Sequence, residues 1–127
     1  MYKFAIKTKV LWGEKKYDDL QSIIKNYLPR ALFIIDRSLE SHPSIDKIKD
    51  IFLNYGFEIQ LIFPNLTGEP SYDDVDRFIN ESKLFEPTLV VGLGGGSILD
   101  LAKAISVMLT NPGKSINYRG MDKVKNP

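Results

Sequence analysis

Runs of apolar residues alternate along the chain with stretches in which apolar residues recur every three or four positions. The runs are typical of buried β-strands, and the spaced pattern is typical of helices with one apolar face. Strands are predicted at 9–12, 31–35, 57–63 and 88–91, and helices at 16–27, from Ser41 or Ser44 to Gly56, from Ser71, and from Ser97 to about 111. The continuous apolar run at 31–35 predicts a central strand. The alternation predicts an α/β fold whose parallel sheet is flanked by helices.

A glycine-rich turn joins the last predicted strand to the last predicted helix. Gly94, Gly95 and Gly96 can adopt positive φ and allow close approach to the backbone. Ser97 is a suitable N-cap, and Asp100 three residues later is close to a capping box. Bare N–H groups and the helix dipole at this point favour a phosphate. The alternative is a tight turn followed by an ordinary cap, with no ligand.

The glycines match neither common nucleotide fingerprint. Ser97 stands where the third glycine of G-x-G-x-x-G would fall if counted from Gly92, and the Lys-Ser/Thr ending of a triphosphate loop is missing. Asp36, the loop 67–70 and the glycines each follow a predicted strand, so all three are expected at one edge of the sheet. Asp36 can accept hydrogen bonds from an adenosine ribose there. It precedes the glycines, whereas the standard fingerprint has its acid after them.

Composition narrows the classes of protein. The 127 residues suffice for one domain with a core, and 17 Lys plus Arg against 16 Asp plus Glu leave a net charge of +1. That balance argues against a basic nucleic-acid binder. There is no cysteine for disulfide or thiol chemistry. No apolar run approaches the length that a membrane-spanning helix needs, and no signal segment is evident, so a cytoplasmic location is expected.

Candidates for catalysis or metal binding are few. His42 is the one histidine of the sequence and precedes Pro43 in a helix-entry loop, where a solvated role is expected. The acidic cluster Asp73, Asp74 and Asp76 is explained by the dipole of the helix that starts there. No acid–base pair or Ser–His–Asp set can be assembled, so no catalytic and no metal-binding residue is predicted.

The pattern Gly-Gly-Gly-Ser-x-x-Asp-x-Ala-Lys at 94–103, after an apolar strand, resembles the iron-containing (group III) alcohol dehydrogenase family. Its wider superfamily includes glycerol dehydrogenase and dehydroquinate synthase. Supporting segments in register are Ile34-Ile35-Asp36, the loop 67–71 and Leu109-Thr110-Asn111, so the resemblance extends over essentially the whole chain. It implies a Rossmann-like, dehydroquinate synthase-like N-terminal domain at 1–127, with a C-terminal helical metal-binding domain outside this chain.

The resemblance also implies roles for individual residues. Gly94, Gly95, Gly96 and Ser97 would hold the pyrophosphate of NAD or NADP, and Asp36 would contact the adenosine ribose. Asp100 either touches the ligand or caps the helix, and capping is the favoured interpretation. Some members of the family have Asn-Pro where this chain has Glu69-Pro70, which places the corresponding cofactor contact in doubt.

The family transfers hydride between a nicotinamide cofactor and a small alcohol or carbonyl substrate. Asp36 favours NAD, because a carboxylate repels a 2′-phosphate, while Arg37 beside it could pair with that phosphate. The divalent metal, such as iron or zinc, is held in the family's helical domain by an Asp and three His. This chain is therefore expected to bind the cofactor but not to catalyse the reaction by itself. A homo-oligomer is compatible with the resemblance, and neither nucleic acid nor a membrane is expected as a partner.

Two interpretations from other classes remain. One is a stand-alone nucleotide- or phosphate-binding module without redox activity. The other is a receiver-like or flavodoxin-like interaction domain. The position of the glycines, after the fourth predicted strand, argues against it.

Overall fold

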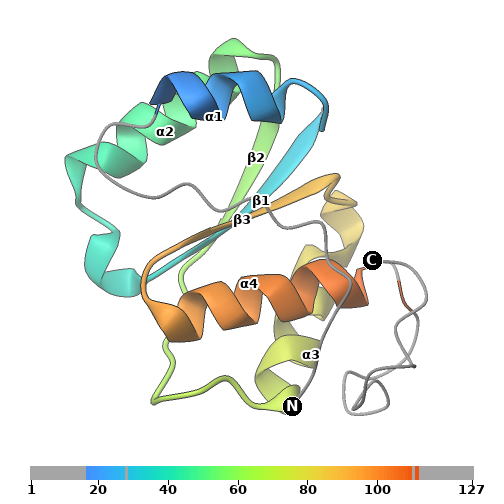
Figure 1. Ribbon diagram of the computed structural model, residues 1–127. Coiled ribbons are helices and arrows are strands. Elements are labelled where there is room, and N and C mark those ends of the chain that lie inside the picture. Colours follow the sequence, from blue (N-terminus) through green and yellow to red (C-terminus); the bar gives the residue numbers. More distant parts are fainter. Residues whose placement is uncertain (1–16, 28, 110, 112–127) are drawn as a thin grey trace.

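The computed structural model describes residues 17–27, 29–109 and 111 (Figure 1). Helices and strands alternate through most of these residues, as the hydrophobic pattern predicts. In chain order the elements are α1 (Tyr17–Ile24), β1 (Arg30–Ile35), the 3₁₀ turn η1 (Arg37–Leu39), α2 (Pro43–Asn54), β2 (Glu58–Ile62), α3 (Tyr72–Ser82), the 3₁₀ turn η2 (Lys83–Phe85), β3 (Leu89–Leu93) and α4 (Gly96–Met108).

The described strands form one parallel sheet in the order β2-β1-β3. Phe33 at the centre of β1 lies opposite Leu61 of β2 and Val91 of β3. Residues 31–35 are fully buried, because β1 has a strand on each side and helices over both faces. The predictions of an α/β fold, a parallel sheet and a central strand at 31–35 are confirmed.

Helices cover both faces of the sheet, α1 and α2 on one and α3 and α4 on the other (Figure 1). Side chains of β1 alternate between the two layers, as the pleat of a strand requires. Phe33 faces α2, where its ring packs edge-on against Phe52 at a centroid distance of 4.8 Å. Leu32 and Ile34 face α4, which buries its predicted apolar face there: Ile98, Leu101, Ala102, Ile105 and Met108.

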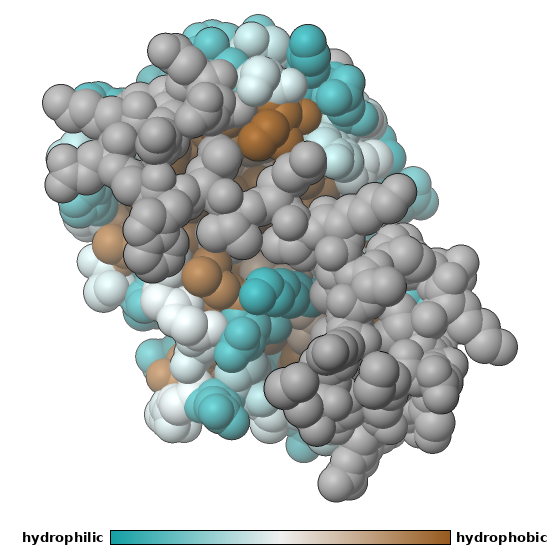
Figure 2. All heavy atoms as spheres, in the orientation of Figure 1, coloured by the Kyte–Doolittle hydropathy of each residue, from teal (hydrophilic) through white to brown (hydrophobic). Residues whose placement is uncertain are grey.

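Polar residues lie mainly at the surface, outside the two apolar layers. On the face drawn in Figure 2, hydrophilic residues line much of the outline of the described part, and the apolar residues that show lie mostly toward the middle. None of the helices that the structure describes has the length and apolar character needed to cross a membrane.

Several boundaries differ from the predicted ones. The strand predicted at 9–12 lies outside the described residues, and the helix predicted at 16–27 is observed over Tyr17–Ile24. The strand predicted at 57–63 is one residue shorter at each end. The last strand begins one residue after Thr88 and continues to Leu93. Its residues are only partly buried, although they pack against both apolar layers, Val90 against one and Leu89, Val91 and Leu93 against the other.

The start of α2 was wrong in the prediction, since neither Ser41 nor Ser44 caps it. The N-cap is His42, whose Nδ1 accepts a hydrogen bond from the Ser44 N–H at 3.1 Å. Pro43 occupies the first helical position, where its fixed φ and missing N–H are tolerated. That placement makes the preceding residue the cap. The predicted stop at Gly56 is confirmed, because Gly56 follows the helix with a φ of 93°.

Candidate functional site

Three segments that follow strands meet at the carboxyl edge of the sheet. They surround a cavity of about 250 Å³ lined by Asp36, Arg37, Pro64, Asn65, Leu66, Gly68, Ser97 and Ile98. Because β2 and β3 both pair with β1 in parallel, the carboxyl ends of the three strands lie side by side. The expectation that Asp36, the loop 67–70 and the glycine turn share one edge is confirmed. From 67–70, Gly68 alone is among the lining residues.

Helix α4 begins earlier than the sequence pattern predicts. Its N-cap is Gly95, with extended backbone angles of φ −81° and ψ −169°, and Gly96 is the first helical residue. The predicted cap by Ser97 is therefore wrong, and so is the capping role of Asp100. Ser97 lies within the first turn and lines the cavity, whereas Asp100 is exposed farther along the helix. The cause is that β3 continues to Leu93, which leaves two residues for the turn.

The glycines of the turn have different physical roles. Of the three predicted to allow positive φ, only Gly94 adopts it, at 152°. A Cβ on Gly94 would lie 2.8 Å from the Cβ of Asp36, so the missing side chain lets the turn pack against that residue. A Cβ on Gly95 or Gly96 would meet nothing within 4 Å. These two glycines therefore border open space in which a ligand can approach the backbone.

Gly92, in β3, is a further position where the missing side chain matters. A Cβ there would lie 2.8 Å from the Cβ of Ala102 on α4. This glycine lets β3 and α4 pack closely. Gly92 stands two residues before the glycine turn in the sequence, and its role is packing.

The first turn of α4 presents backbone N–H groups at the cavity. Its first helical hydrogen bond runs from the Leu99 N–H to the Gly95 carbonyl at 3.0 Å. The N–H groups of Gly96, Ser97 and Ile98 therefore precede the helical ladder, and the N-cap has no side chain to accept from them. The first turn also carries no acidic residue. Such a helix end favours an anion.

Asp36 lies beside Gly94 of the glycine turn, directly after β1. Its Oδ1 accepts hydrogen bonds from both the N–H and the Oγ of Ser38, each at 2.9 Å. These bonds, the backbone one first, lower the pKa of Asp36, so the group is ionised at neutral pH. The Asp36 N–H donates to the Leu93 carbonyl at 2.9 Å, which ties the end of β1 to the end of β3. Within the described residues, Oδ2 accepts no hydrogen bond.

Arg37 links the site to the end of β2. Its Nη2 donates to the Phe63 carbonyl at 3.0 Å, just beyond the end of β2. This bond holds the start of the loop 64–70 against the end of β1. Sequence reasoning did not select Pro64, Asn65, Leu66 or Ile98 as lining residues. Their signal was positional, because three of them directly follow a strand and Ile98 follows the glycines.

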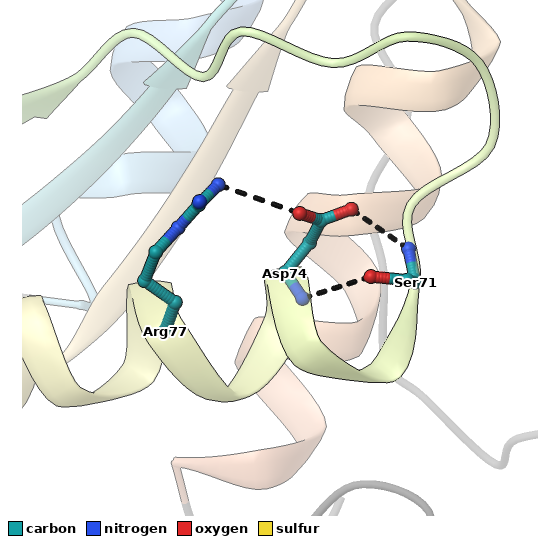
Figure 3. A network of polar contacts seen from close by, with 3 residues as sticks. All are labelled: Ser71, Asp74 and Arg77. Carbon is teal, nitrogen blue, oxygen red and sulfur yellow. Dashed lines mark hydrogen bonds and ion pairs between the residues drawn. The ribbon is translucent and has the colours of Figure 1, made fainter.

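The described residues do not fit a metal ion, since no group of three or more His, Asp or Glu side chains comes together among them. Within the acidic cluster, Asp74 has partners of its own. Asp74 Oδ2 accepts from the Ser71 N–H at 2.9 Å, and its Oδ1 lies 3.4 Å from Nη2 of Arg77 (Figure 3). Ser71 Oγ accepts from the Asp74 N–H at 3.1 Å, which completes a capping box at the start of α3. The exposed His42 is occupied as the N-cap of α2.

Comparisons with known proteins agree with this architecture. The family model for iron-containing alcohol dehydrogenases matches residues 7–127. The crystal structure of an iron-containing alcohol dehydrogenase from Thermotoga maritima superimposes with a TM-score of 0.81 and 28% identity, over 99% of this chain and 35% of that one. An alcohol dehydrogenase of Thermococcus barophilus is 30% identical over 112 residues, which are 88% of this chain and 29% of the relative.

A third relative carries a cofactor in its name. The glycerol-1-phosphate dehydrogenase [NAD(P)+] of Thermoplasma acidophilum is 35% identical over 94 residues, which are 71% of this chain and 26% of that protein. The chain thus spans about a quarter to a third of the length of these relatives. The match over residues 7–127 and the shared parallel α/β architecture make one conclusion plain: the chain belongs to the iron-containing alcohol dehydrogenase family.

Proposed function

We propose that this chain is the dinucleotide-binding part, residues 1–127, of a nicotinamide-dependent alcohol dehydrogenase. The observation that carries the proposal is the meeting of two complementary groups at one cavity. Ser97 and Ile98, in the first turn of a helix that has no side-chain cap, line this cavity together with Asp36, whose side chain carries the carboxylate. A dinucleotide needs both, because its pyrophosphate is an anion and its ribose offers hydroxyl donors.

The cavity residues fit the adenosine and pyrophosphate half of such a cofactor. The open space beside Gly95 and Gly96 gives a phosphate room to reach the backbone, and the α4 N-terminus supplies donors and dipole. Oδ2 of Asp36, which accepts no hydrogen bond from the part of the chain that the structure describes, is placed to accept from a ribose hydroxyl while Oδ1 stays bonded to Ser38. The bound cofactor supplies the hydride chemistry, and this chain's residues bind and orient it.

The cofactor that suits the site best is NAD. The charged Asp36 lines the cavity and repels a 2′-phosphate. Arg37, the cation that could offset this repulsion, already has one guanidinium nitrogen bonded to the Phe63 carbonyl. The name of the Thermoplasma acidophilum relative gives both cofactors, NAD(P)+, and so leaves this choice to the residues of the site.

Hydride transfer needs groups that the described residues do not bring together. They hold neither a metal-binding set nor a paired acid and base near the cavity. We therefore assign the 127-residue chain cofactor binding and no hydride transfer by itself, with the small alcohol or carbonyl substrate belonging to the longer proteins of the family. Alcohol-dependent reduction of NAD by the purified chain with added iron or zinc would contradict this assignment.

Calorimetric titration with NAD tests the site through Gly95→Val. Apart from its neighbours in the chain, a Cβ at Gly95 would meet nothing within 4 Å, so a valine there occupies the open space beside the turn and leaves the core packing intact. We expect NAD affinity to fall by at least about tenfold, because the pyrophosphate loses its approach to the backbone. Asn80→Val, on the exposed side of α3, is the matched control and should bind as the wild type does.

The outcomes separate the proposal from its alternatives. Equal NAD binding by wild type and Gly95→Val removes the glycine turn from the site. A wild-type chain that binds inorganic phosphate but no NAD is instead a phosphate-binding module. Circular dichroism of both variants shows whether the fold is retained, so that a loss of affinity is assigned to the site.

A further inference from the structure

We infer that Ser38 is a positioning residue that locks the Asp36 carboxylate, and that this lock makes the site select dinucleotides with a free ribose 2′-hydroxyl over those with a 2′-phosphate. The inference rests on the proposed function. Ser38 is not among the residues that line the cavity. It acts through Asp36, so neither the glycine motif nor the position of the acid after the strand pointed to it.

The lock consists of restraints on both ends of Asp36. Ser38 donates its N–H and its hydroxyl to the same oxygen, Oδ1, and both distances are 2.9 Å. The backbone of Asp36 is held by the bond from its N–H to the Leu93 carbonyl. Its Cβ packs against Gly94, where an added Cβ would come within 2.8 Å. The side chain therefore has little freedom to rotate, and Oδ2 is the oxygen left for a ligand.

A locked carboxylate affects the two cofactor types in opposite ways. A ribose diol meets an acceptor that is already oriented, so binding does not have to order the side chain. A 2′-phosphate meets a negative charge that cannot swing away. The two donors also stabilise the ionised form, because they lower the pKa of Asp36, and the charge persists at neutral pH.

Arg37 gives the lock a second consequence. It follows Asp36 in the chain and lines the same cavity, and its Nη2 is bonded to the Phe63 carbonyl. When the carboxylate is free to turn, this guanidinium becomes the nearer charge for a 2′-phosphate. Release of the lock should therefore leave NADP binding unchanged or improve it, while NAD binding weakens.

The test compares NAD and NADP dissociation constants in wild type, Ser38→Ala and Ser38→Thr. Alanine removes the hydroxyl donor and keeps the backbone N–H, whereas threonine keeps both. We expect Ser38→Ala to weaken NAD binding by about fivefold, from the cost of ordering one side chain, and to lower the NAD:NADP preference at least as much. Ser38→Thr should restore the wild-type preference, since Ser38 is exposed and an added methyl group has room.

A second readout needs no ligand. The pKa of the Asp36 carboxyl, followed by nuclear magnetic resonance, should rise part of the way toward its ordinary value of 3.8 in Ser38→Ala, because the backbone N–H that lowers it most remains and only the hydroxyl donor is lost. It should stay at the wild-type value in Ser38→Thr. An unchanged NAD:NADP ratio in Ser38→Ala, or an unchanged Asp36 pKa, overturns the lock.

Failure of the lock is distinguishable from failure of the proposed function. Gly95→Val should weaken NAD and NADP alike, because both carry the same pyrophosphate. A wild type that binds NAD and loses it in Gly95→Val, with no change of ratio in Ser38→Ala, keeps the site and discards the lock. A wild type that binds neither nucleotide discards both.

Discussion

Helices α3 and α4 both begin at the carboxyl edge of the sheet, yet the N-terminus of α3 is capped by side chains and that of α4 is not. At α3 the Ser71 hydroxyl accepts from the Asp74 N–H, and the Asp74 carboxylate accepts from the Ser71 N–H (Figure 3). Two acidic residues, Asp73 and Asp74, lie in its first turn. At α4 the N-cap is Gly95, which has no side chain, and the first turn has no acid.

This difference between the two N-termini shows that one helix end serves stability and the other is available to a ligand, although both lie at the same edge of the sheet. The capping box satisfies α3 with its own atoms and surrounds it with negative charge, so an anion gains little there. Helix α4 leaves its first N–H groups to solvent or to a ligand and relies on packing, through Ile98, Leu101 and Ile105, for its stability. A helix end that lacks its own cap is therefore informative when it also borders a cavity.

The largest expected effect comes from giving α4 the kind of cap that α3 has. Gly95→Asp suits the extended N-cap backbone, and its side chain has open space. The new carboxylate takes the first-turn N–H groups and repels pyrophosphate, so NAD affinity should fall by about a hundredfold or more. Chemical denaturation should show the free energy of unfolding unchanged or raised by about a few tenths of a kcal/mol.

The reverse change at α3 serves as the control. Ser71→Ala should lower the free energy of unfolding by about 1 kcal/mol through loss of the cap. NAD affinity should stay at the wild-type value, because Ser71 is not among the residues lining the cavity. If Gly95→Asp bound NAD normally, or Ser71→Ala lost binding, the contrast between the two helix ends would be wrong.

The next effect concerns the two kinds of glycine in the turn. Gly94→Ala forces a side chain onto a residue with φ of 152° and places its Cβ 2.8 Å from that of Asp36. We expect the free energy of unfolding to fall by about 3 kcal/mol, from backbone strain and overpacking together. Gly96→Ala is the matched control, since its Cβ meets nothing within 4 Å, and should leave stability unchanged. Thermal or urea unfolding that ranks the two variants equally would contradict this division.

The smallest expected effect is a dependence of stability on pH at the α3 cap. The Ser71 N–H lowers the pKa of Asp74 in the folded chain. The stabilisation is therefore fully present above the unfolded value, near 3.8, and is lost as the pH falls through the lowered pKa. Asp74→Asn should cost stability at neutral pH and progressively less in acid, as followed by urea unfolding. A constant difference across pH would show that the charge of Asp74 does not contribute.

The sequence pattern succeeded where local chemistry and burial act together. The run at 31–35 has neighbours on every side, and the Ser71 box needs only residues three apart, so both were predictable. The helix starts at His42 and Gly95 were missed because a better capping residue stood nearby in the sequence. There Pro43 and the length of β3 decided the start, and a capping preference of about 1 kcal/mol did not compete.

The sequence predicted several residues of the candidate site, but not the contacts that hold them together. Asp36 and the glycines were selected because parallel strands end at one edge. The structure packs Gly94 against Asp36, and Ser97 lines the same cavity as Asp36. The bond from Arg37 to the Phe63 carbonyl and the division of the glycines into packing and open positions were not accessible. They depend on distances between segments far apart in the chain, which no local pattern encodes.

The sequence by itself determined the order of strands and helices, the central strand and the family, because hydrophobic period, turn residues and a ten-residue motif are local properties. Only the tertiary structure decided which glycine faces a neighbour and which faces open space. It also decided that Ser38 holds Asp36 from one side while Leu93 and Gly94 hold it from the other. The physical reason is that close packing and hydrogen bonding act across the sheet edge, where residues separated by many positions come within a few ångströms.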